Sequence, residues 1–312
     1  MPYIYDIIDG GDIEELKNFL EGGANPDDVS NEDNDDMEGC TPLFFANSEQ
    51  SKILIDAGAN VHQVDSRNEN ALFYLNVIAA EDPEDKLKKV NLLLEHGLDI
   101  NHKNSNGENL LFCMGYEYSL EDLNFFESKG LDIFCINNDN ENLLFKVSDN
   151  QPLAIKKYLV HKGLNIHQEN AYGENLFFKT ENVDTLRYYL NNGVNLSKRN
   201  KDGNTILMLT NSHRVMDFAI KNEIDVHAIS DDGFNALDNC LFFDDIVKTL
   251  LDENIAILHE PENYEGFRSA PMIERKRLEY SKEKALKQKN DIEKSLGCEF
   301  NNTNSLNSKK RI

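Results

Sequence analysis

The sequence predicts an all-α protein built from repeated pairs of short helices, and three observations carry this prediction. A short motif of the form Gly/Asn-Glu-Asn, followed by apolar residues, recurs along the chain. A turn that contains glycine recurs behind most of these motifs at a nearly constant spacing. Between motif and turn, apolar residues lie three or four positions apart, with charged residues between them. Each repeat is therefore expected to hold two helices and a turn.

The repeat at residues 173–196 shows this pattern most fully, with the sequence GENLFFKTENVDTLRYYLNNGVNL. Asn175 is placed to cap the first helix, because its side-chain oxygen can accept a hydrogen bond from an unpaired backbone N–H. Gly193 can adopt the left-handed conformation that ends the second helix. The apolar positions between them predict one buried face, formed by Leu176, Phe177, Leu186, Tyr189 and Leu190.

Further copies of the motif identify the other repeats. The close copies are NENALF at 68–73, GENLLF at 107–112, NENLLF at 140–145 and GENLFF at 173–178, with looser copies at 39–44, 203–208 and 233–238. The glycines of the turn are Gly58, Gly97, Gly130, Gly163 and Gly193, which lie 39, 33, 33 and 30 residues apart. In the last two repeats the turn continues without glycine, at Glu223 and Asn254.

The helix pair, the turn and the period of about 33 residues resemble the ankyrin repeat. The sequences GCTPL at 39–43 and GANV at 58–61 strengthen this resemblance, which covers residues 4–257. It implies a solenoid of about eight units, caps included, in which β-hairpin loops join helix-turn-helix units. The chain departs from the family where Asn replaces the Thr of its Thr-Pro pair and Phe replaces the His that follows. We therefore expect apolar stacking between repeats in place of the family's hydrogen-bond network.

The two ends of the chain and two insertions depart from the repeat. Residues 3–20 predict a capping helix pair, and residues 27–38 an acidic loop behind it. Residues 81–88 lengthen the second full repeat, where Pro83 is placed to begin the longer helix. Residues 1–257 are expected to form the solenoid, and residues 258–312 a charged helical tail with a disordered end at 301–312. The helix of that tail, at 272–296, either covers the last repeat or stands free.

Charge is unevenly distributed along the chain. Of a net charge of −24, residues 258–312 contribute +3, from 12 basic and 9 acidic residues, so residues 1–257 carry −27. Such a field repels phosphate backbones and attracts basic proteins. We therefore expect a basic protein as the partner and no nucleic acid, although solubility is an alternative reason for the charge.

The sequence predicts neither export nor membrane insertion. Residues 1–20 are acidic and lack a signal-peptide pattern, and no apolar run is long enough to span a membrane. The five cysteines show no Cys-x-x-Cys spacing, which is typical of free thiols in a reducing compartment. We expect a cytoplasmic protein of bacterial type that is a monomer when unbound.

Motifs for catalysis are absent from the sequence. Four histidines, His62, His102, His167 and His227, fall near the same part of the repeat, but they match no zinc-binding spacing. The sequence also lacks a phosphate-binding loop after a strand and a Gly-x-Ser-x-Gly elbow. We therefore expect no enzyme activity, no cofactor and no metal site.

The candidate binding residues lie at the start of the first helix of each repeat and at the loop tips before it. One glutamate occupies the same position in four successive repeats, as Glu69, Glu108, Glu141 and Glu174. Stacked repeats would align these side chains ~10 Å apart, as an exposed ladder of carboxylates that attracts a basic partner. The alternative is that Glu is a solvent-facing residue favoured before a helix N-terminus.

Beside this column the tip residues vary from repeat to repeat. They are Arg67, Asn106, Asp139, Tyr172, Asp202, Asp231, Asp232 and Phe234. A constant frame with variable tips is typical of a binding surface, and the resemblance implies a protein-binding scaffold. Our leading interpretation is an intracellular inhibitor that neutralises a basic partner such as a bacterial toxin, as an immunity protein does. A bacterial effector that docks on host proteins and a regulatory adaptor are the alternatives.

Overall fold

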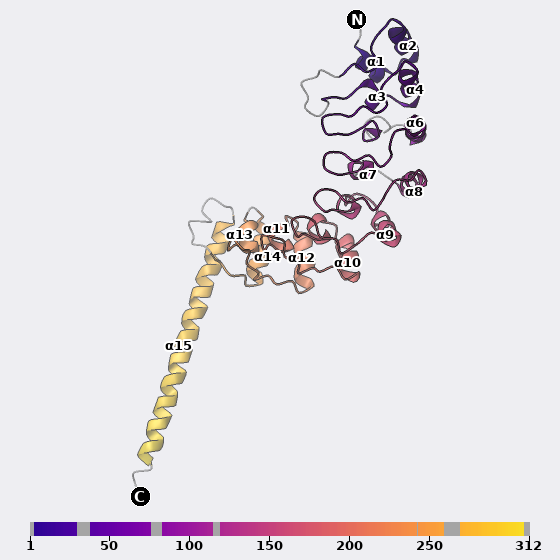
Figure 1. Cartoon of the computed structure of the whole chain (residues 1–312). Helices are drawn as coiled ribbons and strands as arrows, with labels where there is room; N and C mark the ends of the chain where they lie inside the picture. Colours follow the sequence, from indigo (N-terminus) through magenta and orange to yellow (C-terminus); the bar gives the residue numbers. More distant parts are fainter. Residues whose placement is uncertain are drawn as a thin grey trace. The chain divides into compact units, whose positions relative to one another are not determined.

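The computed structural model describes residues 3–29, 38–75, 83–114, 119–241, 243–258 and 269–308. It divides into two compact units, an N-terminal unit at Met1–Val194 and a C-terminal unit at Asn195–Ile312 (Figure 1). Within the described ranges the regular structure is helical, with one isolated β-bridge between Ile136 and Asn142. The predicted all-α class is confirmed.

Helices of the N-terminal unit come in pairs, each with a short first helix and a longer second helix, except that α6 follows a segment described as a turn at 71–74. The first helices are α1 (Ile4–Gly10), α3 (Pro42–Phe45), α7 (Leu110–Cys113), η2 (Leu143–Phe145) and η3 (Leu176–Lys179). The second helices are α2 (Ile13–Glu21), α4 (Ser48–Asp56), α6 (Pro83–Glu95), α8 (Leu120–Ser128), α9 (Leu153–Lys162) and α10 (Val183–Asn191). In Figure 1, α2, α4, α6 and α8 follow one another along one side of this unit, and the short helices with their loops lie along the other.

The C-terminal unit continues the same pairing before it ends in one long helix. Its elements are α11 (Ile206–Leu209), α12 (His213–Lys221), α13 (Ala236–Asn239), α14 (Asp244–Asp252) and α15 (Ala270–Ser308).

An asparagine cap begins most of the short first helices. The Oδ1 atom of Asn175 accepts a hydrogen bond from the backbone N–H of Phe177 at 3.1 Å, as the sequence predicts. Asn109 caps α7 and Asn142 caps η2 in the same way. These two caps also connect the start of their repeat to its end, because their Nδ2 atoms donate to the carbonyls of Asp132 and Asn165 at 2.8 Å. Hydrogen bonds between repeats are present as well, as from Asn104 Nδ2 to Glu69 at 2.9 Å, so apolar stacking does not replace them as expected.

The turn after each second helix requires a left-handed backbone. Gly193 has φ +78° there, as predicted, and the other four turn glycines also have positive φ. Where the glycine is lost, Glu223 at φ +64° and Asn254 at φ +58° adopt the same conformation. The geometry of the turn is thus kept although its sequence signal is not.

Each pair buries the face that the sequence predicts. In the repeat at 173–196, Leu176, Phe177, Leu186 and Tyr189 are at most 1% exposed, and Leu190 is partly exposed. The Phe that ends each motif is buried as Phe44, Phe73, Phe112 and Phe145, and Phe178 is partly exposed.

The start of α15 covers the last helix pair. Ile273 is 2% exposed, the hydroxyl of Ser269 donates to the carbonyl of Leu241 at 2.8 Å, and that of Tyr280 donates to the carbonyl of Ile255 at 3.2 Å. Farther along, residues 281–290 are all exposed. Both readings of this helix thus hold in part, since it covers the last repeat with its first turns and then stands free.

The helix also runs to Ser308, past residue 301, where the sequence predicts disorder. Extending a helix costs far less than starting one, so weak helix formers can continue it. Pro83 begins α6 as predicted. Residues 30–37 of the expected acidic loop, and residues 259–268 at the start of the expected tail, lie outside the described residues.

Candidate binding surface

Loop tips of the N-terminal unit share one backbone geometry. At the start of each tip an Asp or Asn side chain accepts hydrogen bonds from its own loop: Asn104 Oδ1 accepts from the N–H groups of Asn106 and Glu108, both at 3.0 Å. The residue before each glutamate then has positive φ, as at Asn140 (+60°) and Gly173 (+75°). Only Gly and Asn adopt this conformation readily, which explains why the motif alternates between GEN and NEN.

Successive tips are joined by one backbone hydrogen bond per repeat. Ser105 N donates to the carbonyl of Arg67 at 2.9 Å, Asn138 N to that of Asn106 at 2.8 Å, and Ala171 N to that of Asp139 at 2.6 Å. The tip residues are exposed, with Tyr172 at 55%. The predicted tips Arg67, Asn106, Asp139 and Tyr172 therefore form one exposed row, which we call the N-terminal tip row.

The glutamate column lies beneath this row and is not exposed. Glu69, Glu108 and Glu141 are only 8%, 8% and 6% exposed, and Glu174 is partly exposed. The expectation of a solvent-facing carboxylate ladder is therefore wrong, and so is the alternative that these residues simply face the solvent. Each side chain turns inward because hydrogen-bond donors of its own loop and of a neighbouring loop lie within reach of its carboxylate oxygens there.

Asparagine amides connect these glutamates into a continuous chain. Asn104 Nδ2 donates to Glu69 at 2.9 Å and to Glu108 at 3.4 Å. Asn137 Nδ2 bridges Glu108 and Glu141, at 3.3 Å to each. Asn170 Nδ2 continues to Glu141 at 3.3 Å and to Glu174 at 3.0 Å. We call this set the Glu–Asn ladder; it binds each repeat to the next.

Three cations neutralise the ladder. Lys146 Nζ lies 3.2 Å from Glu108 and 3.4 Å from Glu141, and Lys179 Nζ lies 2.9 Å from Glu174. Arg67 pairs with Glu69 at 3.1 Å. Burial lowers the pKa of Lys146, but the carboxylates of Glu108 and Glu141 outweigh burial and hold this pKa above its usual value. The ladder thus presents little charge to a partner.

Two signals in the sequence could have revealed the ladder. An Asp or Asn precedes each glutamate by four residues, and Lys146 and Lys179 follow Glu141 and Glu174 by five. In the preceding repeat, the residue five positions after the ladder glutamate is Cys113 instead of a lysine. Burial and the carboxylates of Glu69 and Glu108 raise the pKa of Cys113 to about 12. Its thiol is therefore protonated at neutral pH.

The predicted tips of the C-terminal unit are joined in the same manner. Asp231 N donates to the carbonyl of Asp202 at 3.0 Å, so these two loops lie side by side. Asp202, Asp231, Asp232 and Phe234 are exposed. Asn204 and Phe234 stand where the earlier repeats have the ladder glutamate. We call Asp202, Ile229, Asp231, Asp232 and Phe234 the C-terminal tip patch.

Histidines and their equivalents pack on the turn of the following repeat. A Cβ placed on Gly97 would lie 3.8 Å from Cε1 of His62, and one on Gly193 would lie 3.8 Å from Cε1 of His167. Phe134 occupies the same place over Gly163. Within the described part of the chain, no group of three or more His, Cys, Asp or Glu residues is arranged to hold a metal ion.

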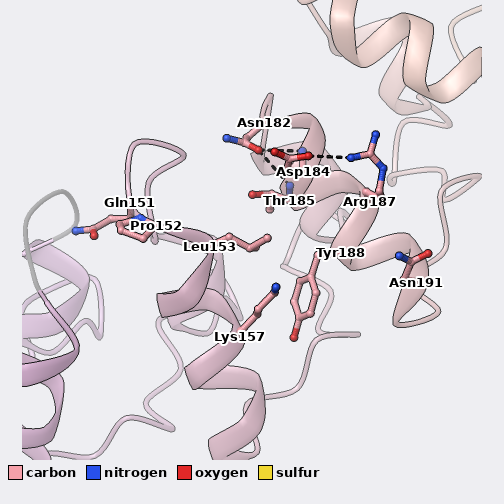
Figure 2. Close-up of a pocket in the computed structure, with 10 residues that line it drawn as sticks. All are labelled: Gln151, Pro152, Leu153, Lys157, Asn182, Asp184, Thr185, Arg187, Tyr188 and Asn191. Atoms are coloured by element: carbon pink, nitrogen blue, oxygen red, sulfur yellow. Dashed lines mark hydrogen bonds and ion pairs between the residues drawn. The ribbon is translucent and has the colours of Figure 1, made fainter.

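A surface pocket of about 520 Å³ lies on the second helices, between α9 and α10 (Figure 2). It is lined by Gln151, Pro152, Leu153, Lys157, Asn182, Asp184, Thr185, Arg187, Tyr188 and Asn191. Lys157 Nζ lies 5.6 Å from the ring centre of Tyr188, and Arg187 pairs with Asp184 at 2.8 Å. Sequence reasoning did not single out these residues, because they come from two different repeats. The pocket is open to solvent, and its one acidic side chain, Asp184, is already paired with Arg187.

Comparison of the chain with protein-family models and with curated proteins finds no match. None of the described helices is both long and apolar enough to cross a membrane.

Proposed function

We propose that the chain is a protein-binding scaffold of the ankyrin-repeat type whose loop tips engage a basic protein. The observation that carries this proposal is the hydrogen-bonded row of exposed tips, with one backbone bond from each repeat to the next. The side chains on this row differ from repeat to repeat while the backbone beneath them stays constant. A constant backbone with variable side chains suits recognition of one specific partner.

The ladder supports binding through rigidity. A surface that is already ordered loses less conformational entropy when it binds, which leaves more of the interaction energy for affinity. Here Asn104, Asn137 and Asn170 fix the loop backbone with Oδ1 and bridge the glutamates with Nδ2. The predicted glutamates thus take part in the proposed function by holding the tips in place.

Charge favours a basic partner. The exposed carboxylates at the tips are those of Asp139, Asp202, Asp231 and Asp232, on a chain of net charge −24. Tyr172 and Phe234 provide exposed aromatic rings beside them, and buried aromatic side chains are frequent hot spots of protein interfaces. The narrower form of the proposal is that the chain neutralises a basic bacterial toxin.

Affinity capture from the source cell, quantified by mass spectrometry, tests the proposal. The bait is the full chain, compared with two tip variants. One carries Tyr172→Ala, and the other carries Asp202→Ala, Asp231→Ala and Asp232→Ala. We expect a protein of basic isoelectric point that the wild-type chain retains and at least one tip variant loses.

A charge-matched control removes three carboxylates from second helices, through Glu49→Ala, Glu95→Ala and Glu121→Ala, all exposed positions. This variant should retain the captured protein. A captured protein that both tip variants retain, and that the control loses, would place the binding surface on the second helices and refute the proposal.

A further inference from the structure

The exposed part of α15 carries a charge opposite to that of the unit it belongs to. Residues 281–290 hold four lysines and one glutamate, and all ten are exposed. Residues 195–258 hold 6 basic and 11 acidic residues. Figure 1 shows that α15 runs clear of α13 and α14 beyond its first turns, so its basic part does not lie against those helices.

One face of α15 combines basic and apolar side chains. At 100° per residue, an arc of about 80° holds Arg275, Leu278, Lys282, Leu286 and Lys289, which we call the basic stripe. Leu278 and Leu286 are 56% and 58% exposed. Ile273 and Tyr280, which pack on the last repeat, lie on the opposite face. The stripe is therefore turned away from the protein's own core.

The C-terminal tip patch has the complementary chemistry. Its apolar side chains, Ile229 and Phe234, are 44% and 42% exposed and stand beside the carboxylates of Asp202, Asp231 and Asp232. Arg199 and Lys201 offset part of this charge, but the Arg199 guanidinium is engaged by the carbonyls of Gly203 and Ile229. Each surface thus has a pair of apolar side chains, flanked by basic residues on the stripe and by acidic residues on the patch.

The spacing of the two surfaces also matches. Arg275, Lys282 and Lys289 recur every seven residues, or ~10.5 Å along a helix. Neighbouring loop tips recur once per repeat, at about one helix diameter or ~10 Å. A helix laid along the tips would therefore bring successive cations to neighbouring loops.

We propose that the basic stripe of one chain binds the C-terminal tip patch of a second copy. If the stripe of each copy binds the tip patch of the other, the two contacts are equivalent and the assembly is a closed dimer. Pairing of two α15 helices through their stripes would instead oppose lysine to lysine. The proposal replaces the sequence-based expectation of a monomer. It rests on the proposed function in one respect: the stripe competes with a basic partner for the same tips.

Sedimentation velocity of the full chain tests this proposal, at about 0.05 M and about 0.5 M salt, where the Debye length falls from ~14 to ~4 Å. We expect a dimer whose dissociation constant rises about tenfold with salt. A stripe variant, Lys282→Glu with Lys289→Glu, should weaken the dimer by about tenfold or more, because it converts attraction into repulsion. A tip variant, Asp231→Lys with Asp232→Lys, should do the same.

Two further variants separate a specific contact from a general effect of charge. The combined stripe and tip variants should associate again, since the charges are exchanged across the contact. The matched control, Lys284→Glu with Lys287→Glu, changes the same charge on the other side of the helix and should leave the dimer unchanged. A monomer at low salt would overturn the proposal, as would equal effects of control and stripe variants.

A monomer whose stripe variant loses binding to a DNA duplex would also overturn the proposal and assign the stripe to nucleic acid. The outcome is distinguishable from failure of the proposed function. A dimer that captures no basic protein would contradict the function alone. A monomer whose tip variant loses its captured partner would contradict the self-association alone.

Discussion

At the residue scale, the structure changes the role of the glutamates that the sequence singles out. Their spacing is correctly predicted, because it follows from the repeat. Their direction is not, since Glu before a helix N-terminus is equally compatible with solvent and with an inward turn. The direction of each glutamate side chain is set by the Asn amides of the neighbouring loops, which lie 29 to 35 residues away in sequence. In the sequence these donors are marked only by the Asp or Asn four residues before each glutamate, which does not show where the glutamate side chain points.

The ladder predicts a large effect of Glu141→Ala. This side chain is buried and accepts from two asparagines, beside Lys146. Its removal leaves one N–H of each asparagine amide without an acceptor, so the free energy of unfolding should fall by about 2 kcal/mol. Glu141→Gln keeps one acceptor oxygen and should cost about half as much. Urea denaturation measures both.

Glu95→Ala is the control for Glu141→Ala, because Glu95 is exposed on α6 and should change stability by less than ~0.5 kcal/mol. Equal stabilities of the Glu141→Ala and Glu95→Ala variants would show that the ladder contributes nothing.

A second residue-scale prediction concerns Lys89 of α6, which is 2% exposed. Its Nζ donates to the carbonyls of Leu43 and Phe44 at 2.9 and 3.0 Å, which joins α6 to the end of α3. Burial lowers its pKa from 10.5 to about 7, although the nearby carboxylate of Asp85 acts in the opposite direction. The unfolded chain therefore binds more protons than the folded chain between those two pH values.

Stability contributed by Lys89 should accordingly rise with pH from about 7 to about 10 and be constant below this window. Denaturation at pH 7, 8 and 9 measures the slope for the wild-type chain and for Lys89→Met, which has a similar length and no charge. The variant should show a smaller increase with pH. Identical slopes would mean that Lys89 titrates alike in the folded and unfolded chains.

At the element scale, caps and turns are what the sequence predicts best. Asn175, Pro83 and the turn glycines act as expected, because each satisfies a local backbone requirement. The Gly/Asn alternation of the motif has the same origin, a residue with positive φ. Helix ends that depend on propagation are less predictable, as the extension of α15 to Ser308 shows.

The turn geometry predicts that Glu223→Gly stabilises the protein. Glu223 has φ +64°, which costs little for glycine but about 1 kcal/mol for other L-residues. The variant should raise the melting temperature, and Gly193→Ala, at φ +78°, should lower it. Opposite shifts in a thermal melt followed by circular dichroism support the account. A destabilised Glu223→Gly would contradict it.

Because the start of α15 packs on the last repeat, substitutions on its two faces should change stability by different amounts. Ile273→Ala removes a buried side chain from the contact with the last repeat and should cost about 2 to 3 kcal/mol. Leu278→Ala, on the same helix but 56% exposed, is the matched control and should change stability little. Thermal melts at low protein concentration compare them. A harmless Ile273→Ala would show that α15 does not stabilise the last repeat.

At the scale of the whole molecule, the repeat itself makes most of the fold predictable. A period near 33 residues places each helix pair, and the shared apolar face places the core. The pocket between α9 and α10 and the asparagine contacts of the ladder were missed, because both bring together side chains of different repeats. The tips were correctly predicted to be exposed, because connecting loops run over the surface of a protein.

The central claim is that exposed tip carboxylates, and not the buried glutamates, attract the partner. The most direct test is the association rate constant of the captured partner at about 0.05 M and about 0.5 M salt, for the wild-type chain, Asp231→Lys with Asp232→Lys, and Glu141→Gln. The account predicts that the tip variant associates several-fold more slowly at low salt, that this difference shrinks at high salt, and that Glu141→Gln associates as the wild-type chain does. A tip variant with unchanged association and unchanged salt dependence would contradict the claim.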